Sequence, residues 1–403
     1  MNIRIEKSKA SGRVSAPPSK SFAHRLIICA ALAGNSRVRN LSPSEDILAT
    51  LDCVSACFGA EYEKEGDNIV FSSSDAYSPA KGALMCRESG STIRFFLPLC
   101  LVKDTECKLY GSEKLMTRPM SVYENICREQ GLTYSHEGDH LLVKGPLKAG
   151  VFTVPGNISS QFISGLMFAL PLLDGDSEIR ILSPLDSKPY IDITMKALER
   201  FGVKAYWKDA LTISVAGGQK YIPSDEAVEG DYSNAAFLSA LDLLGGNVEI
   251  DGLCEDSAQG DKAYIEQFKA LDSGMPTVNI SDCPDLAPIL MSVAAVKNGV
   301  HLTGTARLKI KESDRGEVMA RELAKFGVPV TVNADDITVE GGYFRAPTEP
   351  LYGHNDHRVV MSMAVLCTLT GGEIIGAQAC RKSYPDFFEV IKRLGIEVFE
   401  SGN

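Results

Sequence analysis

One pattern occurs six times along this chain of 403 residues, and it constrains the fold more than any other feature. Each copy has a polar start, an almost purely apolar helix, a short β-branched strand, a second helix, and one or two further strands. The copies begin at Lys20, Ser89, Ser159, Asp231, Asp285 and Asp356. Four of the second helices end at a glycine, a common residue at helix C-termini: Gly59, Gly202, Gly327 and Gly395. Such a repeat predicts an α/β protein assembled from similar units.

The six copies form two groups of three, which predicts two lobes. The break lies at residues 228–233, VEGDYS, where Gly230 offers a turn between them. A short strand at the N-terminus, NIRIEKS, precedes the first copy and is expected to pair with the second group. One lobe is therefore predicted to contain residues 1–13 and 229–403, and the other residues 14–228.

The first helix of each copy is apolar on nearly all sides, so we expect it to be buried among other elements. If three such helices run parallel in each lobe, their N-termini bring together positive helix ends that attract anions. Polar and charged residues occupy these N-termini: Lys20 and Ser21; Ser89, Gly90 and Ser91; Ser159, Ser160 and Gln161; Asp231 and Ser233; Asp285; Asp356, His357 and Arg358. The sequence therefore predicts binding of an anion at the helix N-termini.

Composition limits the nature of that anion and of other partners. The net charge is −11, which argues against nucleic acid or an anionic membrane as a general partner and favours a local site for a small anion. No apolar run reaches the ~20 residues that a membrane span requires, and residues 1–16 lack the apolar core of a signal peptide, so a cytoplasmic location is expected.

The cysteines and histidines give little indication of a metal site. The 11 cysteines are scattered, and most lie inside apolar runs typical of buried thiols. Cys53 and Cys57 form a C-x-x-x-C pair without a second pair, an arrangement that seldom binds metal. His354 and His357 lie three residues apart, so a metal site there remains a minor alternative.

Several charged motifs allow two interpretations when each is taken alone. Arg118, before the helix-opening proline of RPM, suits an anion or an ordinary surface position. The segment SSQF, residues 159–162, suits a phosphate or simple N-capping. KESDR, residues 311–315, suits a site or a solvated charged turn. Arg358 in NDHR suits anion binding or a structural ion pair with Asp356. Their shared position in the repeat favours the functional interpretation, because arginine and paired hydroxyls bind phosphate and carboxylate well.

Together these motifs closely resemble those of the enolpyruvyl transferases, over essentially the whole chain. The segments that carry the resemblance are SKSFAHR, SGSTIR, RP, SSQF, SKPYIDIT, PDLAP, KESDR, NDHR and RKSYPDFF. The resemblance implies an α/β fold of two similar lobes, each with three βαβαββ units and buried parallel helices, which is an inside-out α/β barrel. It implies transfer of the enolpyruvyl (carboxyvinyl) group of phosphoenolpyruvate to the 5-hydroxyl of shikimate 3-phosphate, with release of phosphate, in aromatic amino-acid (chorismate) biosynthesis. It implies neither a metal nor an organic cofactor, and a monomer is expected.

The resemblance also implies roles for individual residues, carried over by position. The implied contacts to shikimate 3-phosphate are Lys20, Ser21, Arg25, Ser159, Ser160, Gln161, Ser187, Tyr190, Asp285 and Lys311. The implied contacts to phosphoenolpyruvate are Lys20, Gly90, Arg118, Gln161, Arg315, Arg358 and Lys382. The implied catalytic residues are Asp285 and Glu312 for proton transfer, with Lys20 assisting and His357 nearby.

Three positions depart from the common pattern of the family. Glu88 replaces a frequent asparagine, Phe95 a frequent proline, and Arg307 an asparagine of some members that contacts the substrate phosphate. These changes leave the reaction intact but leave open the response to inhibitors that mimic phosphoenolpyruvate.

Two other functions remain as alternatives. One is enolpyruvyl transfer to UDP-N-acetylglucosamine, but the loop GSEKLMT before Arg118 lacks the reactive cysteine typical of those enzymes, and the chain carries the SSQ segment that they lack. The other is a non-catalytic anion-binding repeat protein, which the presence of Lys20, Asp285, Glu312 and His357 disfavours.

Overall fold

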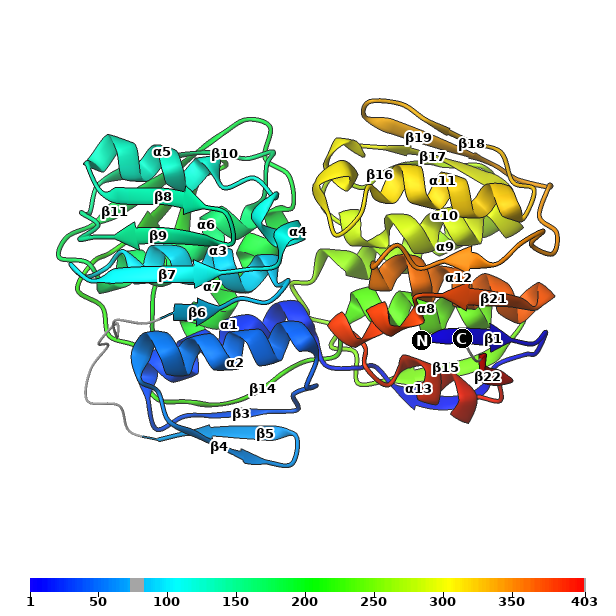
Figure 1. Cartoon of the computed structure of the whole chain (residues 1–403), viewed down its shortest axis with the longest axis horizontal. Helices are drawn as coiled ribbons and strands as arrows, with labels where there is room; N and C mark the ends of the chain where they lie inside the picture. The colour runs from blue at the N-terminus through cyan, green and yellow to red at the C-terminus, as the bar shows by residue number, and fades with distance from the viewer. Residues whose placement is uncertain (73–82, 402–403) are drawn as a thin grey trace. The chain divides into compact units, whose positions relative to one another are not determined.

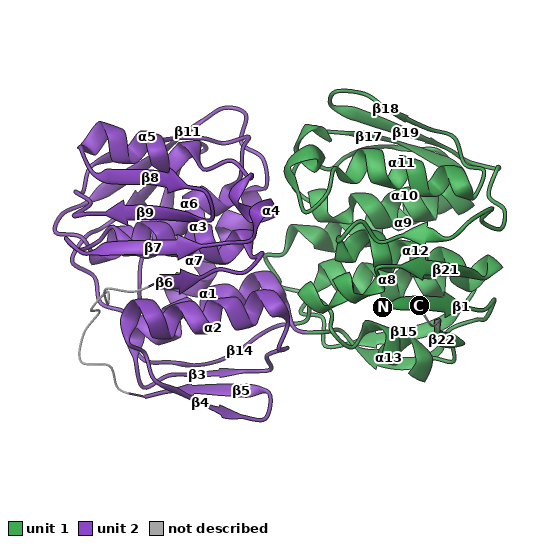
Figure 2. Ribbon diagram, in the orientation of Figure 1, with its two compact units in different colours: residues 1–17, 230–403 green, residues 18–229 purple. Residues whose placement is uncertain are grey.

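The computed structural model describes residues 1–72 and 83–401, and it divides into two compact units (Figure 2). Unit 1 contains Met1–Pro17 and Gly230–Asn403, and unit 2 contains Pro18–Glu229. The chain thus passes from unit 1 to unit 2 after Pro17 and returns after Glu229. The boundaries predicted from the sequence lie after residues 13 and 228.

The described part of unit 2 contains three four-stranded sheets with one shared topology. Each begins with a parallel pair of strands, and two antiparallel pairings complete it. The first sheet has the order β14 (Asp225–Ala227), β3 (Arg37–Arg39), β5 (Asn68–Phe71), β4 (Tyr62–Glu65). The second has the order β6 (Ala83–Met85), β7 (Glu106–Tyr110), β9 (His140–Lys144), β8 (Thr133–Glu137). The third has the order β10 (Val151–Pro155), β11 (Ser177–Leu182), β13 (Thr212–Val215), β12 (Ala205–Asp209).

Unit 1 repeats this topology twice and contains one smaller sheet. The first four-stranded sheet has the order β16 (Thr277–Asn279), β17 (Gly299–Thr303), β19 (Asp336–Glu340), β18 (Val330–Val332). The second has the order β20 (Leu351–Tyr352), β21 (Gly372–Ile375), β1 (Asn2–Ile5), β22 (Val398–Ser401). As predicted, the N-terminal strand β1 pairs with the second group, and Figure 1 shows it in blue beside the red C-terminal strands.

The fourth copy of the repeat differs from its prediction. Its sheet contains only β2 (Ser11–Ser15) and β15 (Asn247–Asp251), which are parallel, and no strand of its own follows its second helix. Only residues 274–276 separate that helix from β16, and β16 already belongs to the next sheet. The chain there is too short for a hairpin, so the fourth copy ends at its helix.

The helices alternate with these strands as the repeat predicts. Those of unit 2 are α1 (Lys20–Ala33), α2 (Glu45–Phe58), α3 (Gly90–Cys100), α4 (Glu113–Met116), α5 (Ser121–Gln130), α6 (Ser160–Ala169) and α7 (Lys188–Arg200), with the 3₁₀ turn η1 (Leu170–Leu172). Those of unit 1 are α8 (Tyr232–Leu243), α9 (Tyr264–Ser273), α10 (Ala287–Val296), α11 (Arg315–Lys325), α12 (His357–Thr370) and α13 (Phe387–Arg393). Unit 1 also has the 3₁₀ turns η2 (Gly260–Ala263), η3 (Pro284–Leu286), η4 (Ala306–Ile310) and η5 (Ala377–Lys382).

The first helices of the copies are buried, which confirms the inside-out arrangement. Ten of the eleven residues of α3, nine of the ten of α10 and twelve of the fourteen of α12 are buried. An apolar helix can be stable in this way only when other elements cover every side. The sheets and the second helices therefore form the outer layer of each unit, and the N-termini of the buried helices are the ends from which polar groups can act.

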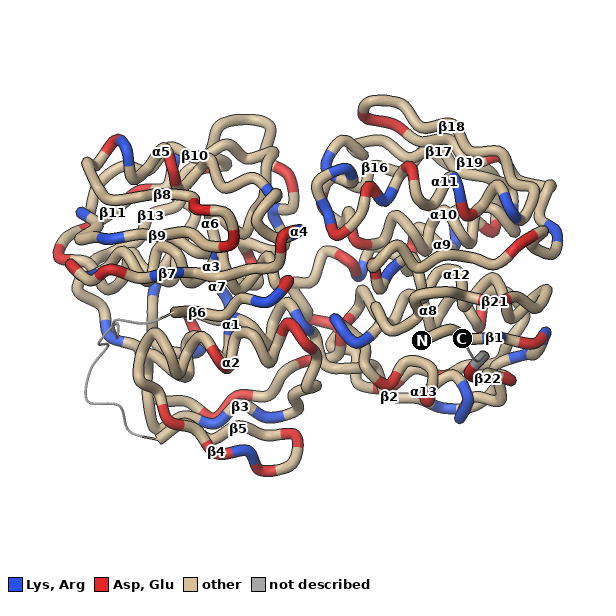
Figure 3. Tube along the Cα trace, in the orientation of Figure 1, with Lys and Arg blue, Asp and Glu red and all other residues tan. Residues whose placement is uncertain are grey.

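Charge is distributed over both units, with acidic and basic residues interspersed (Figure 3). Within the described residues, no helix has the length and apolar character needed to cross a membrane.

Candidate functional site

Three buried helices of unit 2 lie side by side with their N-termini at the same end. The side-chain amide of Gln161, the second residue of α6, donates from Nε2 to Oγ of Ser91, the second residue of α3, at 2.9 Å. Arg25, the sixth residue of α1, lies 5.0 Å from the ring centroid of Phe95, the sixth residue of α3. The predicted parallel arrangement of these helices is therefore present in unit 2, and it concentrates backbone N–H groups at one end.

Serines occupy the cap positions at this end. Ser19, Ser89 and Ser159 are the N-caps of α1, α3 and α6, and each side chain accepts a backbone N–H of the first turn. Ser160 follows its cap, is buried, and is the first residue of α6. The structure thus shows capping by Ser159, and it places the hydroxyl of Ser160 at the positive end of the helix.

The guanidinium of Arg25 is held by protein groups on several sides. Nε donates to Oγ1 of Thr194 at 2.7 Å, and Nη2 donates to the carbonyl oxygen of Tyr190 at 3.0 Å. Nη1 donates to the carbonyl oxygen of Ser21, and Nη2 also approaches Oγ of Ser164 at 3.3 Å. Burial lowers the pKa of Arg25 to about 10, although Tyr190 and Cys29 oppose the shift. Arg25 therefore remains a cation at neutral pH and joins α1, α6 and α7.

A second arginine of unit 2, which sequence reasoning did not assign, orients the candidate residue Gln161 and binds the backbone next to Arg118. Nη1 of Arg94 donates to Oε1 of Gln161 at 2.7 Å, and Nη2 donates to the carbonyl oxygen of Pro119 at 3.1 Å. Arg94 is 2% exposed and lies over the ring of Phe162. The signal was a charged residue inside the otherwise apolar helix α3.

Arg118 and Gly90 lie against each other. A Cβ atom on Gly90 would lie 2.5 Å from Nη1 of Arg118, so only glycine allows the guanidinium to approach the N-terminus of α3 this closely. Nε of Arg118 is buried without a hydrogen-bond partner. A cation beside a helix N-terminus is an unfavourable pairing by itself, and a bound anion would relieve it.

Lys20 forms an ion pair with Asp46 of α2, at 2.8 Å. About one turn further along α1, His24 is buried, and its Nδ1 lies 2.6 Å from Oγ1 of Thr50. Burial lowers the pKa of His24 well below its usual value, and the charges of Lys20 and Arg25 lower it further. His24 is therefore neutral at neutral pH and adds no charge to this end of the unit.

Ser187 and Tyr190 surround the start of α7. Ser187 precedes the helix in a left-handed conformation, with φ 58°, and is buried. Lys188 forms an ion pair with Asp192 at 2.9 Å, and its ammonium lies 4.7 Å from the ring centroid of Trp207.

In unit 1, the carboxylate of Asp285 lies among three cations. Oδ1 accepts from Nη1 of Arg315 at 2.7 Å and from Nζ of Lys311 at 3.2 Å, and Oδ2 accepts from Nη2 of Arg358 at 3.0 Å. Burial alone would raise the pKa of Asp285, but the charges of Arg358, Lys311 and Arg315 outweigh it and hold the pKa well below the usual range. Asp285 is therefore an ionised carboxylate at neutral pH.

Arg315 connects this carboxylate to two others. Its Nη2 donates to Oε2 of Glu312 at 2.6 Å, and its Nε donates to Oδ2 of Asp356 at 2.9 Å. The side chain is 1% exposed. Burial would lower its pKa, but the charges of Asp356, Glu312 and Asp285 raise it well above the usual value. Arg315 therefore links the carboxylates of Asp285, Glu312 and Asp356.

The N-termini of the three buried helices of unit 1 also meet. Nη1 of Arg358, the second residue of α12, donates to Oγ of Ser233, the second residue of α8, at 2.6 Å. The bond of Arg358 to Asp285 adds η3, which leads directly into α10. Asp356 is the N-cap of α12, and His357 begins the helix and is 2% exposed. Unit 1 therefore presents charged side chains where unit 2 presents mainly hydroxyls.

The pKa of Lys311 is unusually low for a lysine. Burial lowers its pKa to about 8, and the charges of Arg307 and Arg315 add to this effect, while those of Asp285 and Glu312 oppose it. The charge of Arg307 thus lowers the pKa of Lys311. This is a physical consequence of having an arginine at position 307, where some members of the family have asparagine.

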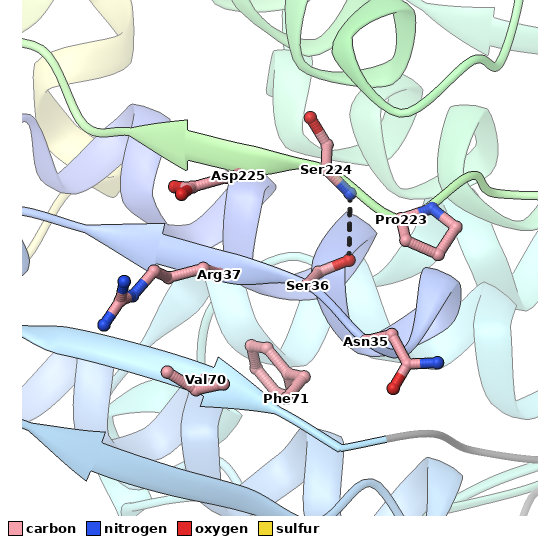
Figure 4. Close-up of a pocket in the computed structure, with 8 residues that line it drawn as sticks. All are labelled: Asn35, Ser36, Arg37, Val70, Phe71, Pro223, Ser224 and Asp225. Atoms are coloured by element: carbon pink, nitrogen blue, oxygen red, sulfur yellow. Dashed lines mark hydrogen bonds between the residues drawn. The ribbon is translucent and has the colours of Figure 1, made fainter.

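The remaining features do not extend the site. His354 contacts Glu322, and among the described residues no three or more His, Cys, Asp or Glu side chains form a group that could hold a metal ion. A cavity of about 430 Å³ lies elsewhere in unit 2 (Figure 4), and its lining residues are Asn35, Ser36, Arg37, Val70, Phe71, Pro223, Ser224 and Asp225. Its polar groups already bind neighbours, including Ser36 with Ser224 and Asp225 with Arg39. None of the predicted site residues lines it.

Comparisons with known proteins all identify the same family. Residues 5–391 match the family model described as EPSP synthase (3-phosphoshikimate 1-carboxyvinyltransferase). The chain is 38% identical to the 3-phosphoshikimate 1-carboxyvinyltransferase of Clostridium beijerinckii, with 100% of this chain and 99% of that protein covered. It is 39% identical to the protein of the same name from Clostridium perfringens, with 98% of each covered.

Solved structures show the same fold. The EPSP synthase from Acinetobacter baumannii superposes with a TM-score of 0.81 at 24% identity, covering 99% of this chain and 100% of that one. The enolpyruvyl transferase NikO from Streptomyces tendae superposes with a TM-score of 0.79 at 13% identity, covering 99% and 98%. At these identities the superpositions concern the fold alone, and they confirm the predicted inside-out α/β architecture.

Proposed function

The chain belongs to the EPSP synthase family of 3-phosphoshikimate 1-carboxyvinyltransferases, and from this premise we propose that the side chains described above bind its two anionic substrates and move its protons. The reaction transfers the enolpyruvyl group of phosphoenolpyruvate to shikimate 3-phosphate in the shikimate pathway of aromatic amino-acid biosynthesis. Transfer to UDP-N-acetylglucosamine and a non-catalytic role, the alternatives that the sequence left open, are set aside by this membership.

The observation that supports the assignment of chemistry is the ionised carboxylate of Asp285 beside Glu312, with cations around both. In the proposed first step, Asp285 accepts the proton of the 5-hydroxyl of shikimate 3-phosphate. The oxygen of that hydroxyl attacks C2 of phosphoenolpyruvate, and Glu312 donates a proton to C3. In the second step, the bond from C2 to the phosphate oxygen breaks, phosphate leaves with the proton that Asp285 gives up, and Glu312 takes the proton back from C3. We assign Lys20 as an assisting cation and place His357 close to the reacting atoms.

Arginines and lysines supply the charge that these anions require. The proposed contacts to phosphoenolpyruvate are Lys20, Gly90, Arg118, Gln161, Arg315, Arg358 and Lys382. The proposed contacts to shikimate 3-phosphate are Lys20, Ser21, Arg25, Ser159, Ser160, Gln161, Ser187, Tyr190, Asp285 and Lys311. The unpartnered Nε of Arg118 beside the N-terminus of α3 supports an anion there.

Phosphate release tests the proposal directly. The purified chain should release inorganic phosphate from phosphoenolpyruvate only when shikimate 3-phosphate is also present, and UDP-N-acetylglucosamine should not replace it. Phosphate release with UDP-N-acetylglucosamine, or no release with either acceptor, would contradict the proposal.

Replacing Ser160 by alanine is expected to weaken binding of shikimate 3-phosphate more than binding of phosphoenolpyruvate. A hydrogen bond from a hydroxyl to a charged phosphate is worth roughly 1.5–3 kcal/mol. The dissociation constant of shikimate 3-phosphate should therefore rise about tenfold to about 100-fold. Titration calorimetry measures both ligands. Ser121→Ala is the matched control, because Ser121 also begins a helix of unit 2 but is exposed and is not one of the proposed contacts. Equal losses for the two ligands would refute the assignment of Ser160.

Affinity for shikimate 3-phosphate is expected to fall as pH rises through about 8. The pKa of Lys311 is lowered to about 8 by burial, so the ammonium is charged below this pH and loses its charge above it. Loss of a cation that contacts an anion weakens binding, and the bound anion in turn raises the pKa of the lysine. Dissociation constants measured on both sides of this pH give the profile. In Lys311→Arg the charge persists, so the profile should flatten; an unchanged profile would show that another group titrates.

We further propose that the enzyme acts as a monomer in the cytoplasm. All the proposed contacts come from one chain, so a second copy is not needed to supply a residue. The described cysteines are free thiols, and all except Cys254 are buried, which suits a reducing compartment. Light scattering at working concentration and cell fractionation measure the two properties.

A further inference from the structure

A buried carboxylate outside the proposed substrate contacts holds the chain that leads into α12. Glu322 of α11 has no exposed side-chain surface. Its Oε1 lies 2.8 Å from Nε2 of His354, and its Oε2 accepts from Nζ of Lys325 at 2.8 Å and from the backbone N–H of Tyr352 at 2.9 Å. A buried carboxylate with three hydrogen-bonding partners fixes their positions, because moving any one of them would expose an unmet charge to a low-dielectric interior.

The chain that Glu322 holds adopts a costly conformation. His354 and Asn355 both have left-handed backbones, with φ of 48° and 54°. Two consecutive residues other than glycine in this region persist only where their surroundings hold them. On one side Gly353 donates its N–H to the carbonyl oxygen of Ile375 at 2.8 Å, and on the other Asp356 caps α12. Between these two points, the bond of His354 to Glu322 ties the turn to the buried face of α11.

This turn presents a carbonyl group to a proposed substrate contact. Nζ of Lys382, at the end of η5, donates to the backbone oxygen of Asn355 at 2.8 Å. The orientation of that carbonyl depends on the φ and ψ angles of Asn355 and its neighbour His354. A change at His354 would therefore reach the ammonium of Lys382 through one peptide group, without any contact between the two side chains.

We propose that Glu322 and His354 are positioning residues for Lys382, and that their bond places its ammonium for phosphoenolpyruvate. This inference rests on the proposed role of Lys382 in the site. It assigns to α11 a task besides carrying Arg315 at its N-terminus: its inner face holds the turn from which α12 begins. The contribution concerns phosphoenolpyruvate and not shikimate 3-phosphate, because the proposed contacts to the latter do not include Lys382.

Three substitutions at two histidines test the proposal. His354→Asn keeps a residue that tolerates a left-handed backbone but is too short to reach Glu322. His354→Gln keeps an N–H donor at a similar distance from the backbone. His301→Asn is the control, since His301 lies in β17 of the same unit and loses a comparable bond, to Thr338 at 3.0 Å. The readouts are KM for each substrate, kcat and the melting temperature.

KM for phosphoenolpyruvate is expected to rise about tenfold in His354→Asn, as for the loss of one charge-assisted hydrogen bond. KM for shikimate 3-phosphate should stay within about twofold of wild type. His354→Gln should recover most of the loss, and His301→Asn should leave both constants unchanged. Equal rises in both KM values, or no recovery in His354→Gln, would indicate a purely structural role and overturn the proposal.

A double-mutant cycle shows whether His354 acts through Lys382. In a Lys382→Met background, His354→Asn should have little further effect on KM for phosphoenolpyruvate, because the group it positions is absent. Additive effects would overturn the proposal. If Lys382→Met alone leaves this KM unchanged, the proposed role of Lys382 fails, and the positioning role fails with it. If Lys382→Met raises the KM but His354→Asn does not, only the positioning role fails. Should His354→Asn not fold, Glu322→Gln enters the same cycle with the same expected results.

Discussion

Replacing Glu312 by glutamine is expected to slow turnover by about 10²–10⁴-fold, the usual contribution of a general acid–base group. C3 of phosphoenolpyruvate must gain a proton in the first step and lose one in the second. Glutamine keeps the shape of the side chain and can still accept from Arg315, which donates to Glu312 at 2.6 Å, but it cannot transfer a proton. Binding of both substrates should therefore change much less than turnover.

Exchange of the methylene hydrogens at C3 with deuterium in heavy water reports this proton transfer directly. With shikimate 3-phosphate present, exchange should fall in Glu312→Gln in proportion to turnover. Glu317→Gln is the matched control, because Glu317 lies five residues further along the chain, in the first turn of α11, and is exposed. Exchange at the wild-type rate in Glu312→Gln would remove Glu312 from this role and make Lys20 the leading candidate.

Replacing Asp285 by asparagine is expected to produce a loss of similar size, about 10²–10⁴-fold in turnover, for a different reason. Asparagine cannot accept the proton of the 5-hydroxyl, and the three cations that surround Asp285 lose their shared counter-charge. Those cations should then attract phosphoenolpyruvate at least as strongly as before. Turnover should therefore fall sharply while KM for phosphoenolpyruvate stays the same or decreases.

Steady-state kinetics over a range of pH separates this effect from misfolding. The pKa of Asp285 lies well below its usual range, so protonation of Asp285 should not produce an acidic limb in the wild-type rate between about pH 5 and about pH 8. Asp282→Asn is the control, since Asp282 is three residues away and exposed. A rise in KM for phosphoenolpyruvate with little change in kcat would show that Asp285 organises the cations and is not the base.

Position in the repeat made much of the candidate site predictable. Ser160, Gly90 and Arg358 could be identified because each lies at the start of an apolar helix, and both the helix start and the apolar run are local sequence signals. The six copies likewise indicated the α/β class and the burial of the first helices. These features depend on neighbours within a few residues, and the sequence records such neighbours directly.

The partners of the same residues could not be predicted from local signals. Arg25 donates to Thr194, 169 residues away, and Arg358 donates to Ser233, 125 residues away. The sequence analysis included Arg94 in the motif SGSTIR but assigned it no role. In the structure Arg94 orients Gln161, which lies 67 residues away along the chain. The shortened fourth sheet was also missed, because nothing local marks a strand as belonging to the following copy.

By itself the sequence determined the family and the reaction, through the resemblance of its motifs to those of the enolpyruvyl transferases. It also determined the repeated α/β architecture and the residues that begin each buried helix, because apolar periodicity and capping chemistry act over one or two helical turns. Only the tertiary structure decided how those residues are charged and held. Asp285 stays ionised because three cations from two distant segments converge on it, Lys311 and Arg315 from one and Arg358 from the other. Lys311 loses its proton near pH 8 because the fold buries it among charged neighbours. Burial and Coulomb energies depend on distances through space, and the order of residues along the chain does not contain those distances.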